Sequence, residues 1–117
     1  GPPKARYYTM SALITSDAVI ERNPEHAAAA VRALVKCQQA LKKDVSLATK
    51  VGRKLFPEHE ASLIADVVAR DLPYYDATVS PEFVAGMMEF QINQGLIEKP
   101  VAYEDAVATR FASLWKP

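Results

Sequence analysis

The order of hydrophobic and polar residues predicts one strand near the start of the chain and helices after it. From Tyr8 to Thr15 the residues alternate, so that Tyr8, Met10, Ala12 and Ile14 share one face. A lone strand leaves a ladder of backbone donors and acceptors unpaired, and even a two-stranded hairpin is marginal in water. We therefore expect either a piece of a larger fold or a chain that pairs with the edge of a neighbour.

The strongest helix signal follows directly. Ser16 or Asp17 is expected to cap a short turn to about Arg22, and Asn23-Pro24-Glu25 then supplies an N-cap, a proline at N1 and an early acid. The helix after it should reach about Lys43. Its apolar face is predicted to contain Ala27, Ala30, Val31, Leu34, Gln38 and Leu41.

Two more helices are expected before a proline loop. Asp44 is placed to cap the first, which Pro57 ends, and the second runs to Leu72, because the residue before Pro73 avoids the helical region. Residues 73–76 read as a loop. The buried face of the first of these helices is predicted to be Leu47, Ala48, Val51 and Leu55.

The last third of the chain predicts two further helices. Ser80-Pro81-Glu82 repeats the cap, proline and acid of a helix start, and Gly95 stands where a glycine commonly ends a helix. Residues 104–114 are expected to form the final helix. In the helix between Ser80 and Gly95, a broad apolar surface is made by Phe83, Val84, Met87, Met88 and Phe90.

Composition indicates a soluble globular chain without a dominant charge. Basic and acidic residues both number 14 in 117, so no net field steers the chain toward nucleic acid or an anionic membrane. Cys37 is the only cysteine, which excludes an internal disulfide. No apolar run has the ~20 residues of a membrane span. Residues 1–6 are interpreted as a tag remnant or a crossover linker, and residues 7–117 as one helical part.

The sequence offers no catalytic or metal constellation. His26 and His59 lie on different predicted helices, and neither has a second ligand at a convincing spacing, so exposed helix-start residues are the favoured interpretation. No nucleophile–base pair or phosphate loop is recognisable. Cys37 is read as a small core or boundary residue. We therefore expect a protein that is not an enzyme, with no cofactor and no bound metal.

Two clusters could serve in binding. Seven basic residues against the single acid Asp44 occupy residues 32–54, which suits an anion or an acidic partner, although a solvated helix face is the favoured reading. A second cluster contains Arg6, Tyr7 and Tyr8. An arginine guanidinium can make two hydrogen bonds to an anionic group, and tyrosine rings offer flat apolar faces, so this combination suits a binding cleft for a small anionic molecule. These three residues are the ligand-binding candidates. Tyr74-Tyr75 is a second aromatic pair, of which one ring is expected to pack and one to be exposed.

The order of motifs resembles the closing portion of substrate-binding proteins of ABC transporters. The nearest group is the nitrate, sulfonate, taurine and thiamine-pyrimidine-precursor type. The resemblance covers about Tyr8 to Phe111. It rests on Ile14-Thr-Ser-Asp-Ala-Val-Ile-Glu-Arg-Asn-Pro-Glu25 before an alanine-rich helix, then Ser80-Pro81-Glu82, Gly95-Leu96-Ile97, Pro100-Val101 and Tyr103-Glu104-Asp105-Ala106-Val107.

The resemblance implies a mainly α chain of five to six helices with one N-terminal strand, forming the C-terminal part of a two-lobed α/β periplasmic-binding-protein type II fold. It implies a solute-binding component of an importer that delivers a small molecule, with anionic solutes among the candidates, to a membrane permease. The location would be periplasmic or otherwise extracytoplasmic, with the cytoplasm left open. Nucleic acid is not an expected partner, and self-association through the 8–15 strand is. The alternatives are a stand-alone helical interaction module and, least favoured, a relative of the pyrimidine-precursor synthases.

Overall fold

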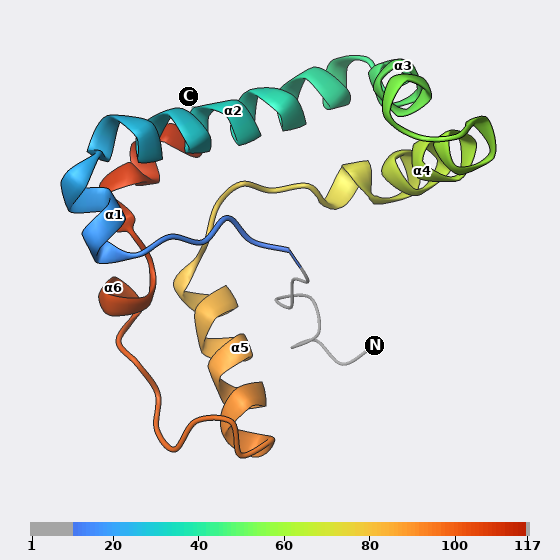
Figure 1. Cartoon of the computed structure of the whole chain (residues 1–117). Helices are drawn as coiled ribbons and strands as arrows, with labels where there is room; N and C mark the ends of the chain where they lie inside the picture. The colour runs from blue at the N-terminus through green and yellow to red at the C-terminus, as the bar shows by residue number, and fades with distance from the viewer. Residues whose placement is uncertain (1–10, 117) are drawn as a thin grey trace. The chain divides into compact units, whose positions relative to one another are not determined.

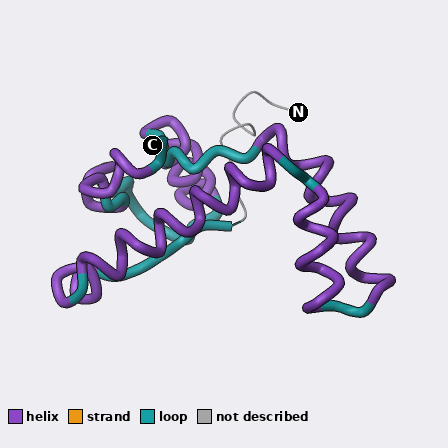
Figure 2. The backbone as a smooth tube through the Cα atoms, turned by 90° about the horizontal axis from the view of Figure 1, so that it is seen from above, coloured by secondary structure: helices purple, strands orange, loops and turns teal. Residues whose placement is uncertain are grey.

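The computed structural model describes residues 11–116, and every regular element among them is helical (Figures 1 and 2). The chain divides into two compact units, residues 1–28 with 78–117 and residues 29–77. None of the described helices is long and apolar enough to cross a membrane. The elements in order are α1 (Asp17–Arg22), α2 (Pro24–Lys43), α3 (Ser46–Leu55), α4 (Glu58–Asp71), the 3-10 turn η2 (Leu72–Tyr74), α5 (Pro81–Asn93), α6 (Tyr103–Ala106) and the 3-10 turn η3 (Thr109–Leu114).

The expected N-terminal strand is wrong where it can be compared. Residues 11–15 of the predicted strand have no regular secondary structure, and residues 8–10 lie outside the described residues. Within residues 11–116 there is no strand or sheet at all, so the predicted α/β two-lobed fold is also contradicted. The physical reason is that alternation only makes a segment suitable for a sheet, whereas a strand needs a second edge to receive its hydrogen bonds.

Helix starts in the first unit follow the capping residues closely. The Ser16 hydroxyl accepts from the Val19 amide at 3.3 Å and begins α1. The Asn23 carbonyl accepts from the first amides of α2, with the His26 nitrogen at 3.1 Å. Ser80 begins α5 by accepting from the Phe83 amide at 3.1 Å. Each side chain or carbonyl satisfies a donor that the helix itself leaves unpaired, so these starts are set locally.

Gly95 ends α5 as the sequence predicted. Its φ of +73° lies in the left-handed region, where a residue with a Cβ is strained. Its amide donates to the Ile92 carbonyl at 3.0 Å, and the Leu96 amide donates to the Gln91 carbonyl at 2.9 Å. These two bonds form a Schellman motif, which closes the helix and turns the chain into the connector that begins at Leu96.

The single helix predicted over residues 104–114 is wrong, because the chain breaks at Val107. That residue is extended, with φ −122° and ψ 130°, and it separates the one-turn helix α6 from the six-residue turn η3. Val107 is β-branched and loses little by leaving the helix. The 3-10 turn that follows buries Phe111, whose ring also carries the Arg110 guanidinium 5.3 Å from its centre.

The second unit is built around the helical hairpin of α3 and α4 (Figure 1). The two helices meet through small residues: Gly52 and Ala61 are both buried, and a Cβ placed on Gly52 would lie 3.4 Å from that of Ala61. Small residues let the two backbones approach closely. Phe56 and Pro57 make the short turn between the helices, since Pro57 cannot continue α3 but precedes the first turn of α4.

The ends of the second unit show two differences from the predicted elements. Asp44 lies one residue before the N-cap of α3, and its carboxylate accepts from the Ser46 amide at 3.1 Å. The turn η2 continues through Pro73 to Tyr74, where a loop was expected, because a proline near the start of a helical turn gives up no needed hydrogen bond. The Lys42 ammonium then donates to the Tyr75 carbonyl at 2.7 Å and ties the end of α2 to this loop.

Few apolar side chains are buried in the described part of the chain. They are Ile20, Val35, Ala61 and Phe111. The buried faces predicted for α2 and α3 are therefore partly wrong. Large residues assigned to them, or lying on α4, are exposed: Leu34, Val51, Leu55, Leu63 and Val67. Hydrophobic periodicity predicts which side of a helix is apolar, but it does not predict whether another part of the chain covers that side.

Candidate functional site

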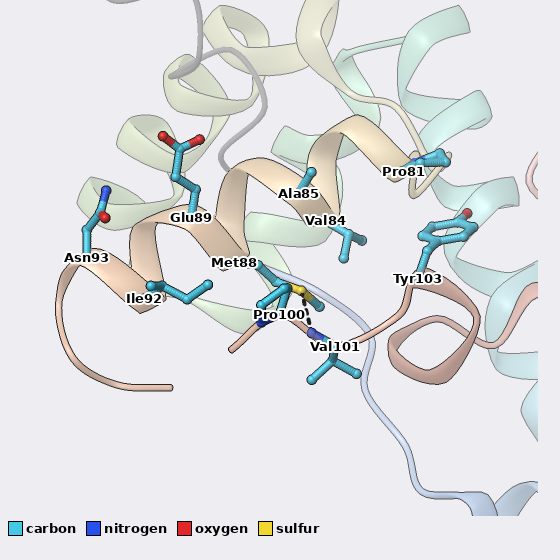
Figure 3. Close-up of a pocket in the computed structure, with 10 residues that line it drawn as sticks. All are labelled: Pro81, Val84, Ala85, Met88, Glu89, Ile92, Asn93, Pro100, Val101 and Tyr103. Carbon is cyan, nitrogen blue, oxygen red and sulfur yellow. Dashed lines mark hydrogen bonds between the residues drawn. The ribbon is translucent and has the colours of Figure 1, made fainter. Parts of the chain in front are cut away.

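The clearest hollow in the first unit is an apolar groove along one face of α5, with a volume of 320 Å³ (Figure 3). Its floor is contributed at helical spacing, and the connector after α5 forms its second wall. This volume lies at the lower end of the range for small-molecule sites. We call it the α5 groove; its lining residues are Pro81, Val84, Ala85, Met88, Glu89, Ile92 and Asn93 from α5, with Pro100, Val101 and Tyr103 from the connector and α6.

Two hydrogen bonds hold the second wall in place. The Val101 amide donates to the Met88 sulfur at 3.2 Å, drawn as the dashed line in Figure 3. The Tyr103 hydroxyl donates to the Val79 carbonyl at 2.5 Å, just before the Ser80 cap of α5. The connector is thus fastened to α5 near the middle of the helix and to the segment that precedes it.

The lining of the α5 groove favours an apolar ligand, or the apolar part of a larger one, over an anion. Val84, Met88 and Ile92 supply aliphatic and thioether surface, and Glu89 with Asn93 lies toward one end (Figure 3). Glu89 is the only charged lining residue, and a carboxylate repels an anionic ligand. The geometry offers binding surface, and the lining contains no nucleophile and base together.

The opposite side of α5 is also apolar. Phe83, Met87 and Phe90 follow one another at spacings of four and three residues. They lie about a third of a turn from Val84 and Met88 and about half a turn from Ile92. Phe83 and Met87 are half-buried and Phe90 is 42% exposed. A helix that is apolar on both sides is typical of one enclosed by other polypeptide.

Two other hollows are more polar. One in the first unit, between residues 15–21 and 104–110, has acids at Asp17, Glu21, Glu104 and Asp105. One in the second unit lies beside Arg53, Glu58 and Asp66. Among residues 11–116 no group of three or more His, Cys, Asp or Glu is placed to hold a metal ion.

The candidates named from the sequence fare unequally. Arg6, Tyr7 and Tyr8 lie outside the described residues. Tyr74 is 85% exposed and Tyr75 is half-buried, which confirms that one ring of that pair packs and the other does not.

The remaining candidates are surface residues. His26 and His59 are exposed in the first turns of α2 and α4, as expected of helix-start residues. Cys37 is exposed on α2, so its assignment to the core or its boundary is wrong. The basic side chains of residues 32–54 are all exposed.

Two local pairs within residues 11–116 have shifted pKa values. Hydrogen bonds from the Ser46 hydroxyl and amide lower the pKa of Asp44 below its usual value. A two-point contact at 2.7 and 3.0 Å with the Arg70 guanidinium lowers the pKa of Asp71 and raises that of Arg70. Both pairs are on the surface, so they indicate helix-end chemistry and not a poised acid or base.

Sequence reasoning identified Val84 and Met88 as part of an apolar surface of α5, but it missed Ile92 and the groove. The groove was missed because its second wall is formed by Pro100 and Val101. No pattern in the sequence indicates that this connector folds back on the helix before it. Comparison with protein-family models, with curated proteins and with solved structures finds no match for this chain.

Proposed function

We propose that this chain is a helical part of the solute-binding component of an ABC-type importer, which binds a small molecule outside the cytoplasm and delivers it to a membrane permease. The observation that carries the proposal is the agreement between the family-like motifs and the helix ends. Asn23-Pro24-Glu25 begins α2, Ser80-Pro81-Glu82 begins α5, and Gly95 ends it. The residues on which the resemblance rests therefore mark helix starts and a helix end in this chain, which supports the proposal.

The exposed apolar surface supports the same proposal. Both sides of α5 are apolar, and the α5 groove is open. A helix of this kind is stabilised when further polypeptide covers it, as it would be inside a larger binding component. The α5 groove carries Glu89 and no cation, so an anionic solute would be bound by residues elsewhere in the component.

The test begins with the gene. We expect the reading frame to continue upstream of Gly1 and to lie beside genes for a permease and an ATPase. The full-length protein encoded by this frame should then bind one of nitrate, taurine, an alkanesulfonate or the pyrimidine precursor of thiamine. Isothermal titration calorimetry measures this binding. A frame that starts near Gly1, with no permease or ATPase gene beside it, overturns the proposal.

A stand-alone helical interaction module is the second candidate, and the apolar side of α5 at Phe83, Met87 and Phe90 favours it. Such a module should be a monomer at micromolar concentration and unfold in one cooperative step. Sedimentation and urea unfolding of the chain measure both properties. Self-association of the chain, with release of monomers by Phe90→Glu, contradicts the module and agrees with an apolar surface that other polypeptide normally covers.

A further inference from the structure

Helix α3 carries an exposed apolar stripe beside an exposed basic one. Val51 and Leu55 are four residues apart and therefore lie on one face, where they are 54% and 69% exposed. Lys50 and Lys54 each precede one of them, which places both lysines about 100° away on the adjoining face. The packed face lies on the other side, because Gly52 contacts Ala61 of α4.

The order around the helix is therefore packed, apolar, then basic. Helix α3 contacts α4 through the small residue Gly52, and Val51 and Leu55 remain exposed. Phe56, which ends the helix, is a further large apolar residue and is 44% exposed. A short helix with this arrangement matches those that lie in a membrane interface, with apolar residues inserted and lysines at headgroup level.

Charge in this part of the chain points to an anionic partner. Residues 32–54 hold seven basic residues and one acid, Asp44, although the whole chain is neutral. The Asp44 carboxylate is engaged with Ser46 at the start of α3. On the neighbouring helix α4, Glu58 and Asp66 share a hollow with Arg53 of α3, whereas Lys50 and Lys54 do not line that hollow.

We propose that α3 docks on an anionic lipid surface, with Val51 and Leu55 inserted among the lipids and Lys50 and Lys54 at the headgroups. Lipid is favoured over single-stranded nucleic acid because Val51 and Leu55, the exposed residues next to the lysines within α3, are aliphatic and only Phe56 at its end is aromatic. Single-stranded nucleic-acid sites interleave basic residues with several aromatic ones. The inference goes beyond the proposed function and does not depend on it.

The test is co-sedimentation of the full chain with vesicles of equal parts phosphatidylcholine and phosphatidylglycerol, and with vesicles of phosphatidylcholine alone. We expect binding to the anionic vesicles that weakens as salt is added. A lysine near an anionic surface contributes about a fivefold change in partitioning, so Lys50→Gln with Lys54→Gln should lower it by about 25-fold. The matched control, Lys99→Gln with Lys116→Gln, removes two exposed lysines from the other unit and should change nothing.

A second variant tests the apolar stripe. Val51→Ser with Leu55→Ser should lower partitioning by about tenfold, and because both side chains are exposed the helix content by circular dichroism should not fall. Absence of binding to anionic vesicles, equal binding to phosphatidylcholine alone, or equal losses in the test and control lysine variants would each overturn the proposal. Binding of polyglutamate or single-stranded DNA as tight as that of the vesicles would overturn the choice of lipid.

Discussion

Replacing Gly52 by alanine should stabilise the α3–α4 hairpin, although the position is buried. A Cβ at Gly52 would lie 3.4 Å from the Cβ of Ala61, 3.5 Å from its Cα and 3.7 Å from its carbonyl oxygen. These are ordinary van der Waals distances, so the helices need not move apart. A glycine inside a helix costs about 0.8–1.0 kcal/mol relative to alanine. The expected gain is therefore about 0.8 kcal/mol.

Two companion variants fix the interpretation. Gly52→Leu adds atoms beyond the Cβ toward the backbone of Ala61 and should destabilise the hairpin by about 1–3 kcal/mol. Ala61→Gly removes a buried methyl group and adds the glycine penalty, which together amount to about 1.5–2 kcal/mol. A gain for alanine with losses for the other two is what a contact between small residues predicts.

Native-state amide exchange followed by NMR is the assay, because it reports on the hairpin separately from the other unit. The Phe56 amide donates to the Gly52 carbonyl at 2.8 Å, and the Ala61 amide donates to the Pro57 carbonyl at 2.9 Å. Both should exchange about fourfold more slowly in Gly52→Ala, since 1.4 kcal/mol corresponds to a factor of about ten. Faster exchange in this variant would refute the reasoning, because it would mean that no methyl group fits between the helices.

Three further predictions concern helix ends and can be checked by NMR or urea unfolding. Ser80→Ala removes the acceptor for the Phe83 amide and should destabilise α5 by about 1 kcal/mol, whereas Ser80→Asp should keep the cap. Gly95→Ala places a Cβ at φ +73° and should cost about 1–2 kcal/mol, even though the space beside it is open. Asp44 has a lowered pKa in the folded chain, so its stabilising effect is present above the ordinary value of 3.8 and is lost as the pH falls below it. Ser46→Ala should raise the Asp44 pKa toward that value in an NMR titration, and an unchanged pKa would contradict the assigned cause.

Local signals in the sequence located most helices, whereas the alternation that predicted a strand was misleading over residues 11–15. Pro24 and Ser80 mark helix starts and Gly95 marks a helix end, because capping depends on a few neighbouring atoms. The alternation before Thr15 depends instead on a partner edge, and the described chain supplies none. The same limit applies to residues 104–114, where the extended Val107 breaks a helix that periodicity predicted as continuous.

The sequence by itself determined where α2 and α5 begin and that α3 has an apolar face. Only the tertiary structure decided that α3 packs through Gly52 and leaves Val51 and Leu55 exposed. It also decided that Val101 closes the α5 groove by donating to Met88. Capping and periodicity act over one or two turns of chain and can be read from neighbours, whereas the choice of packed face and the return of a connector depend on which surfaces fit in space.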